Sequence, residues 1–307
     1  MKWASSVAAI GIWLACAPFP AKAEEDQALR DVRILSADEM EGRAPGTRGS
    51  ARARAFLLER FRQLGLKPAY AALEQPFFYT IGGERRSGVN LVGQIDGTGT
   101  SDKVLVVTAH YDHLGVRRGK VFNGADDNAS GVAGLLAIAA SFRRLPPEHT
   151  VIFAALDAEE TGHGGARMFV LRPPLPLSRI GLNLNLDMLS KSSRGELYAA
   201  GGYHFPGLRP WLDRLQASAP VHLKQGHDGP PWSGRADWTS ESDHHQFHRK
   251  GIPWVYFGVE DHAEYHEPTD DYATIPTAFF LKSIVTVVKA ARLFDSCLDE
   301  DFGRRAR

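Results

Sequence analysis

The chain of 307 residues has little cysteine, with Cys16 and Cys297 as its two examples. Cys16 lies in a segment that we expect to be removed, so Cys297 would be left without a partner and no disulfide framework could form. Metal sites built from several thiolates are excluded for the same reason. The folded chain must therefore be stabilised by its apolar core or by a metal ion with other ligands.

An excess of charge of one sign is also missing. The chain has 36 Lys and Arg residues against 36 Asp and Glu residues. Proteins that bind nucleic acid or an anionic membrane usually carry a basic stripe or patch, and we find none in the sequence. We therefore expect no nucleic-acid partner.

Long apolar runs are absent too, and the one near the start is short. It extends from about Val7 to Cys16, follows Lys2 and precedes the sequence Ala21-Lys22-Ala23. A membrane span needs about 20 apolar residues, whereas a basic start, a short apolar run and an A-x-A site are typical of a secretory signal peptide. We expect residues 1–23 to be cleaved off and the product to be periplasmic or secreted, without stable membrane insertion. Lipidation at Cys16 is disfavoured, because Trp13 stands where a small aliphatic residue is normally found.

What remains, residues 24–307, is long enough for one large domain with a sizeable core. Apolar runs typical of buried strands alternate with helical patterns along this part of the chain. Such alternation predicts a three-layer α/β/α fold with a mostly parallel central sheet. The predicted strands lie within residues 103–115, 150–160, 180–190 and 251–260, helices within 129–145, 164–172 and 277–297, and a hairpin or edge pair within 77–97. The sequence leaves the oligomeric state open.

Acidic residues and histidines gather where the predicted strands end. Ligands bind at the carboxyl ends of the strands in open α/β sheets, so these side chains should meet at one edge. The residues are His110 and Asp112 after the first strand, Asp126 and Asp127 before the following helix, Glu159 and Glu160 after the second strand, Asp187 after the third, and His262 and His266 after the fourth.

Imidazole nitrogens and carboxylate oxygens together favour zinc, manganese or cobalt. The set exceeds what one tetrahedral ion needs, whereas two ions about 3.5–4 Å apart that share a carboxylate would use it fully. One of the adjacent glutamates could bind metal while its neighbour accepts a proton from water. This pattern predicts hydrolysis assisted by two metal ions.

The ordered motifs "AHYDH", "GADDNASG", "DAEETG", "LNLDM" and "YHEPTDD" resemble those of the M28 family of zinc aminopeptidases, and the resemblance extends over nearly all of residues 24–307. It implies two Zn²⁺ ions, with Mn²⁺ or Co²⁺ as possible replacements for one, and peptides as substrates. It also implies a cis peptide bond between Asp127 and Asn128. The implied roles are His110 and Asp187 on one ion, Glu160 and His266 on the other, Asp127 across both, Glu159 as general base, and Asp112 as the acid that orients His110.

Other residues near these motifs have simpler explanations. We expect Asp126 to cap a helix, Arg43 to form a structural salt bridge, and Asp243 and His244 to support the site. Two pairs of alternatives stay open: Asp270 orients His266 or is a turn residue, and Phe247 lines the substrate pocket or belongs to the core. Four more histidines are expected on the surface or in loops, namely His113, His163, His245 and His248, and Tyr265 is a candidate for stabilising an oxyanion.

The leading hypothesis is an exported aminopeptidase that removes N-terminal residues. A carboxypeptidase on the same scaffold would need a cationic pocket, for which Arg43, Arg235 and Lys250 are the candidates. A glutaminyl cyclase would use a single zinc ion and leave His110 and Asp187 surplus, and a binding module would need no Glu159. The pocket that reads the substrate side chain should come from loops around residues 203–247, including an irregular surface loop at 224–242.

Overall fold

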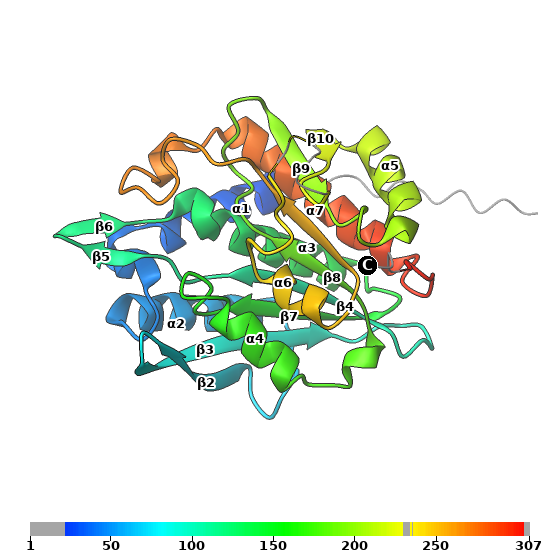
Figure 1. The fold of residues 1–307 in the computed structure, drawn as a ribbon, viewed down its shortest axis with the longest axis horizontal. Coiled ribbons are helices and arrows are strands. Elements are labelled where there is room, and N and C mark those ends of the chain that lie inside the picture. The colour runs from blue at the N-terminus through cyan, green and yellow to red at the C-terminus, as the bar shows by residue number, and fades with distance from the viewer. Residues whose placement is uncertain (1–21, 230–233, 235, 304–307) are drawn as a thin grey trace, which may run out of the picture.

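The computed structural model describes residues 22–229, 234 and 236–303 (Figure 1). Of the predicted signal peptide, residues 1–21 lie outside this part of the chain. Its last two residues begin helix α1, Lys22–Leu35.

The described residues form one sheet of nine strands, in the order β1-β3-β7-β4-β8-β11-β9-β10, with β2 paired to β3. The four central strands are parallel to one another. Towards each edge the direction changes, because β3 runs antiparallel to β7 and β9 antiparallel to β11. The strands are β1 Lys67–Pro68, β2 Glu74–Ile81, β3 Glu84–Ile95, β4 Val104–His110, β7 Thr150–Leu156, β8 Ile180–Leu186, β9 Glu196–Ala200, β10 His222–Gln225 and β11 Trp254–Gly258.

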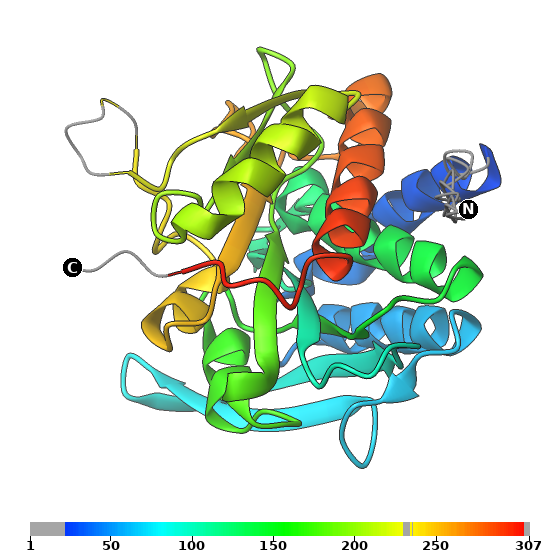
Figure 2. The same ribbon diagram turned by 90° about the vertical axis from the view of Figure 1, so that its right-hand side faces the viewer.

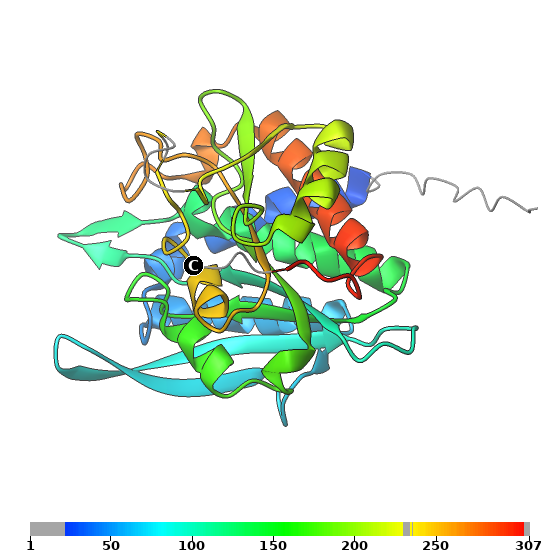
Figure 3. The same cartoon turned by 45° about the vertical axis from the view of Figure 1, so that its right-hand side comes forward.

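The apolar runs form the central strands because helices cover both faces of the sheet. Every residue of β4, β8 and β11 is buried, and full burial of a Val, Leu or Ile side chain contributes about 1.5–3 kcal/mol. A near-continuous apolar run is typical of such strands, although β8 also contains Asn183 and Asn185, whose buried amides form hydrogen bonds. The predicted three-layer fold with a central parallel sheet is therefore confirmed, and so is the predicted hairpin, formed by β2 and β3 along one edge (Figure 3).

The two helix layers are unequal (Figure 2). The larger core cluster joins one face of the sheet to most of the helices, and the smaller cluster includes Phe169 and Phe247 on the other face. The larger layer contains α1, α2 (Arg48–Gln63), α3 (Gly131–Arg144), α5 (Arg209–Ser218) and α7 (Thr277–Asp295), and the smaller contains α4 (Gly164–Leu171) and α6 (His244–Arg249). A two-stranded sheet of β5 (Gly115–Arg117) and β6 (Lys120–Phe122) projects from the body (Figure 1).

Helix α7 is followed by Cys297, which is buried as a free thiol, as expected for a cysteine without a partner. Within the described residues, we find no helix whose length and apolarity would let it cross a membrane.

The register of the central strands decides where the polar residues meet. His110 at the end of β4 pairs with Leu156 at the end of β7. Leu186 at the end of β8 pairs with Phe257 of β11. Because the parallel strands end almost level, the residues that follow them project from the same edge of the sheet.

Arg43 connects several segments near that edge of the sheet through hydrogen bonds to their backbone. Its guanidinium is fully buried and donates to the backbone carbonyls of Leu35, Tyr111, Asn123 and Gly124. The prediction of a salt bridge was wrong, because carbonyl oxygens rather than a carboxylate accept its hydrogen bonds. Burial lowers the pKa of Arg43 to about 10, so the side chain keeps its charge at neutral pH.

Candidate metal centre

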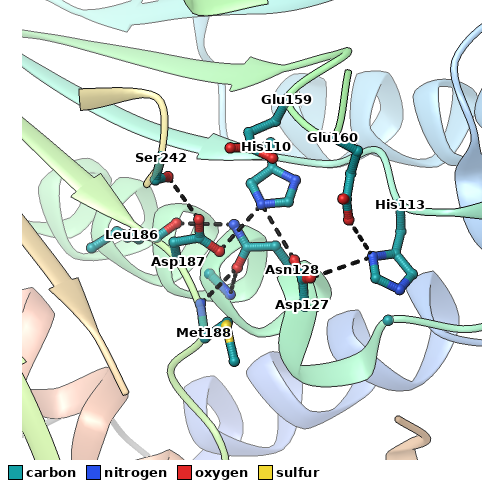
Figure 4. A network of polar contacts seen from close by, with 12 residues as sticks. His110, His113, Asp127, Asn128, Glu159, Glu160, Leu186, Asp187, Met188 and Ser242 are labelled. Atoms are coloured by element: carbon teal, nitrogen blue, oxygen red, sulfur yellow. Dashed lines mark hydrogen bonds and ion pairs between the residues drawn. The ribbon is translucent and has the colours of Figure 1, made fainter. Parts of the chain in front are cut away.

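Most of the predicted site residues converge at the carboxyl edge of the sheet (Figure 4). Two groups of side chains there have ligand atoms within 4.8 Å of one another. One group is His110, Asp127 and Asp187, and the other is His113, Asp127 and Glu160. Asp127 belongs to both groups, as expected of a carboxylate shared between two ions.

The first group is held by the ends of β4 and β8. The Nε2 atom of His110 lies 3.2 Å from Oδ1 of Asp187 and 3.4 Å from Oδ1 of Asp127. The other oxygen of Asp187 accepts a hydrogen bond of 2.7 Å from the hydroxyl of Ser242, which in turn accepts one from the side chain of Asn185. Ser242 thus fixes one carboxylate oxygen and leaves the other facing His110.

His266 lies beside the second group, so two histidines rather than one face Asp127 and Glu160. The Nε2 atom of His266 lies 3.1 Å from Oδ2 of Asp127 and 3.3 Å from Oε2 of Glu160. The Nδ1 atom of His113 lies 2.7 Å from Oε1 of Glu160 and 3.6 Å from Oδ2 of Asp127. His113 lies in the loop after β4, as one of the two predicted alternatives had it, but its place in the site was not expected. The chain turns inward after β4, so its side chain is buried, with 1% exposed.

The backbone around Asp127 has an unusual geometry. The peptide bond between Asp127 and Asn128 is cis, as the resemblance implied. The side-chain oxygen of Asn128 accepts hydrogen bonds from the backbone N–H groups of Gly131 and Met188, and its amide donates to Leu186. These contacts tie the start of α3 to the end of β8 directly beside the two ligand groups.

Asp112 contacts the adjacent glutamates as well as His110. Its two carboxylate oxygens accept hydrogen bonds from the backbone N–H groups of Glu159, at 3.0 Å, and of Glu160, at 3.4 Å. Its Oδ1 atom lies 3.7 Å from Nδ1 of His110, whereas its backbone oxygen lies 3.2 Å from the same nitrogen. Asp112 therefore fixes the position of the glutamate pair relative to the first histidine.

Glu159 lines a cavity that opens over the site, whereas its neighbour Glu160 points towards His113 (Figure 4). Burial raises the pKa of Glu159 well above its usual range, and although His110 opposes the shift, Asp187 adds to it. The Oε1 atom of Glu159 lies 3.1 Å from Nε2 of His163. His163 is in a loop, as predicted, but its contact with Glu159 was not foreseen.

Asp126 and Asp270 are fully buried next to Asp127, the residue that the two groups share. Asp126 does not cap a helix, contrary to the prediction, because its carboxylate accepts hydrogen bonds from the backbone N–H and hydroxyl of Ser190 and lies 2.9 Å from Nε2 of His262. Its side chain bridges separate loops, and within its own segment it accepts a hydrogen bond from the hydroxyl of Ser130 rather than from a backbone N–H group.

Asp270 neither orients His266 nor serves only as a turn residue. Its fully buried carboxylate accepts hydrogen bonds from the backbone N–H groups of Asp126 and Asp127. It also forms an ion pair of 2.9 Å with Nζ of Lys191. The backbone N–H of Asp270 also donates to the carbonyl of Glu267 and closes a turn, so the turn alternative is confirmed, and among the described residues no hydrogen bond or ion pair joins Asp270 to His266. Lys191 and Asp270 together hold the backbone that carries Asp127.

The segment around α6 supports the site from the other side. Asp243 is fully buried, and burial raises its pKa well above the usual range. His244 is also buried and its pKa is lowered well below the usual range by burial, so it is neutral. Phe247 packs against Phe169 in the core and does not line the cavity, which settles the open alternative. His245 and His248 lie partly buried in α6, rather than in a loop.

Charge makes this site suitable for a cation. Burial alone would lower the pKa of His266, yet Asp127 and Glu160 raise it to about 10. The pKa of His110 is likewise raised, against the effect of burial, chiefly by Asp187 and Glu159. Both ring nitrogens of His113 and Oε1 of Glu160 are buried without a hydrogen-bond partner. Nitrogen and oxygen donors in this arrangement fit zinc, and the unpaired buried atoms indicate that a ligand belongs there.

A cavity of about 420 Å³ opens over the first group and His266. Part of its wall comes from the 224–242 segment, as predicted, although residues 230–233 and 235 lie outside the described chain. Its described lining contains carboxylates and aromatic rings but no Lys or Arg. The lining residues are His110, Asp127, Glu159, Asp187, Met188, Ala236, Asp237, Trp238, Glu241, Tyr256, Val259, Asp261, Tyr265 and His266.

Comparisons with known proteins identify the family of the chain. The model of peptidase family M28 matches residues 90–291, more than half of the chain. The alkaline phosphatase isozyme conversion protein of Escherichia coli is 26% identical over 194 residues, covering 58% of this chain and 55% of that protein. Aminopeptidase YwaD of Bacillus subtilis is 29% identical over 181 residues, covering 54% of this chain and 36% of that protein. The chain thus spans about half, or less, of the length of these relatives.

Solved structures show the same fold. A zinc aminopeptidase from Bacillus subtilis superimposes with a TM-score of 0.71 at 17% identity, covering 91% of this chain and 96% of the other. Glutaminyl cyclase from Porphyromonas gingivalis superimposes with a TM-score of 0.72 at 18% identity, covering 88% and 97%. The fold is therefore shared by peptidases and by a cyclase.

Proposed function

Because the chain belongs to peptidase family M28 and is a metallopeptidase, we propose that it is an aminopeptidase with two zinc ions. The observation that carries this proposal is the pair of ligand groups joined by Asp127, which itself lines the cavity. A peptide bound in the cavity would have its terminal residue beside Glu159. We further propose that the protein is exported, on the strength of residues 1–23 alone.

The lining of the cavity favours an amino terminus over a carboxyl terminus. The free end of an aminopeptidase substrate is cationic, whereas that of a carboxypeptidase substrate is anionic. Among the described residues that line the cavity, Asp237, Glu241 and Asp261 add negative charge and no Lys or Arg offsets them. Three cations were considered for a pocket that binds a substrate carboxylate. The guanidinium of Arg43 already donates its hydrogen bonds to backbone carbonyls, and Lys250 is exposed after the end of α6. Arg235 lies outside the described residues.

The residues that would hold the ions are the first group, together with Glu160 of the second group and His266 beside it. His110 and Asp187 would bind one ion, Glu160 and His266 the other, and Asp127 both. When bound, zinc supplies Lewis acidity that lowers the pKa of a water molecule towards about 7 and polarises the scissile carbonyl. A single-zinc cyclase would leave His110 and Asp187 without a role, so the first group favours a peptidase.

The chain's own residues would manage the protons. Glu159 would accept a proton from the attacking water and deliver it to the departing amine, a role that suits a carboxyl group with a raised pKa. Asp112 would hold Glu159 and Glu160 in register through their backbone N–H groups. Tyr265, whose ring stacks on His266 and whose pKa is raised by burial, keeps its hydroxyl proton and could donate to the oxyanion.

Removal of metal tests this function. We expect a chelator to abolish peptide hydrolysis, because the activation of water is lost, and zinc to restore it. Mass spectrometry of a mixed peptide set should show stepwise loss of N-terminal residues in the zinc-loaded sample only.

The other outcomes each contradict the proposal in a different way. Loss from C-termini would make the protein a carboxypeptidase. Loss of ammonia from N-terminal glutamine, with the chain intact, would make it a cyclase. Zinc bound with no change in any peptide would leave a binding module.

A further inference from the structure

His113 has no role in the function proposed above, yet its environment is that of a ligand. Its side chain is buried in the site, and neither ring nitrogen has a hydrogen-bond partner among the described residues. Leaving a buried imidazole without a hydrogen-bond partner is unfavourable, because the ring loses its contacts with water and gains nothing in return. Such a cost at the centre of a site calls for a partner that binds the ring.

The partner is indicated by what His113 faces. Its Nδ1 atom lies 2.7 Å from Oε1 of Glu160, but neither atom has a hydrogen bond to offset its burial. The two atoms approach one another without the alignment of a hydrogen bond. Two ligands of one cation can approach in this way, since the ion lies between their lone pairs.

The distances agree with a shared ion. Ligand atoms about 2.0–2.2 Å from one zinc ion lie at most about 4 Å from one another. The four distances that join His113 and His266 to Asp127 and Glu160 range from 2.7 to 3.6 Å. The rings of the two histidines lie edge to face with their centroids 5.8 Å apart, so both face the same pair of carboxylates without competing for space.

We propose that His113 is a fourth protein ligand of the ion held by Asp127, Glu160 and His266. The proposal rests on the proposed zinc centre and extends it. The second ion would then have four protein ligands, whereas the first would have three, namely His110, Asp127 and Asp187. Four protein ligands are typical of a closed zinc site, and three leave a position for water or substrate.

This asymmetry assigns different tasks to the two ions. The second site binds more tightly, fills first and keeps its ion when zinc is scarce. The first site holds its ion more weakly and offers the open position. Loss of a residue that only supports a metal ligand lowers metal affinity by about 10–100-fold. Loss of His113 as a direct ligand should therefore lower the zinc affinity of the second site by more than this.

Zinc titration of His113→Gln tests the proposal. The metal-free protein starting at residue 24 is titrated with zinc against a chromophoric chelator, which reports two dissociation constants. We expect the tighter constant of the variant to rise by more than about 100-fold, with the looser one little changed. His222→Gln is the matched control, because His222 is exposed on β10, outside both ligand groups and the cavity lining, and it should titrate like the unchanged protein.

If the variant fails to fold, X-ray absorption spectroscopy of the unchanged protein tests the same proposal. Its zinc spectrum, recorded with two zinc ions bound, reports how many imidazoles bind the ions. Three imidazoles shared between the two ions are expected, from His110, His113 and His266, whereas two would overturn the proposal. Unaltered constants in a folded His113→Gln protein would overturn it as well. If the unchanged protein binds fewer than two ions, the zinc centre of the proposed function fails, which is a different result from either.

Discussion

Glu159→Gln is expected to lower kcat by about 10²–10⁴-fold, the usual contribution of a general acid–base group. The amide has nearly the same shape as the carboxyl group but cannot accept the proton from water. Because Glu159 belongs to neither ligand group, zinc content and KM should change little. Steady-state kinetics on a peptide, with metal analysis of the same samples, measures all three quantities.

The adjacent glutamate provides the contrast. Glu160→Gln should lower zinc affinity before it lowers kcat in saturating zinc, because Glu160 faces His113 and His266. If Glu159→Gln lost zinc while Glu160→Gln retained it, the two roles would be exchanged. If Glu159→Gln kept full activity, the proton transfer would have to be reassigned.

Lys191→Met is expected to lower the free energy of unfolding by about 3–5 kcal/mol, because it leaves the buried charge of Asp270 without its partner. The side chain of Lys191 is only 6% exposed and that of Asp270 is fully buried. For a chain of this size the midpoint of thermal unfolding should fall by roughly 10 °C. Zinc affinity should also fall, since Asp270 accepts the backbone N–H of Asp127.

Lys224→Met is the matched control for this variant. Lys224 pairs with Glu196, but its side chain is 32% exposed, and pairs near the surface usually contribute about 0–1 kcal/mol. Thermal unfolding with and without zinc compares the two variants. Equal, small shifts for both would mean that the Lys191–Asp270 pair does not hold the backbone of the site.

Much of the fold could be predicted because its central strands are buried on both faces. Apolar runs such as residues 151–156 contain no polar residue until the strand ends, so the polar residues that follow mark the edge of the sheet. Parallel strands place those ends together, which is why His110, Asp127, Glu160 and Asp187 were expected to meet. The reversed direction of β3 and β9 at the two sides carries no such mark in the sequence.

The supporting residues could not be predicted because long-range contacts decide them. His113 follows the end of β4, where strand periodicity no longer says which way a side chain points. Arg43 binds carbonyls that belong to segments as many as 81 residues away. The pairing of Lys191 with Asp270 spans 79 residues. The sequence "AHYDH" did contain one usable signal, a second histidine three residues after the first in a strongly acidic neighbourhood.

The most direct test of the whole account compares one peptide in three forms: with both ends free, with its N-terminus acetylated, and with its C-terminus amidated. The zinc-loaded protein should remove the first residue from the free and the amidated peptides and leave the acetylated peptide intact, because the acidic cavity requires a cationic amino terminus. Cleavage of the acetylated peptide alongside an intact amidated one would contradict the account, since it would show that the enzyme reads the carboxyl end.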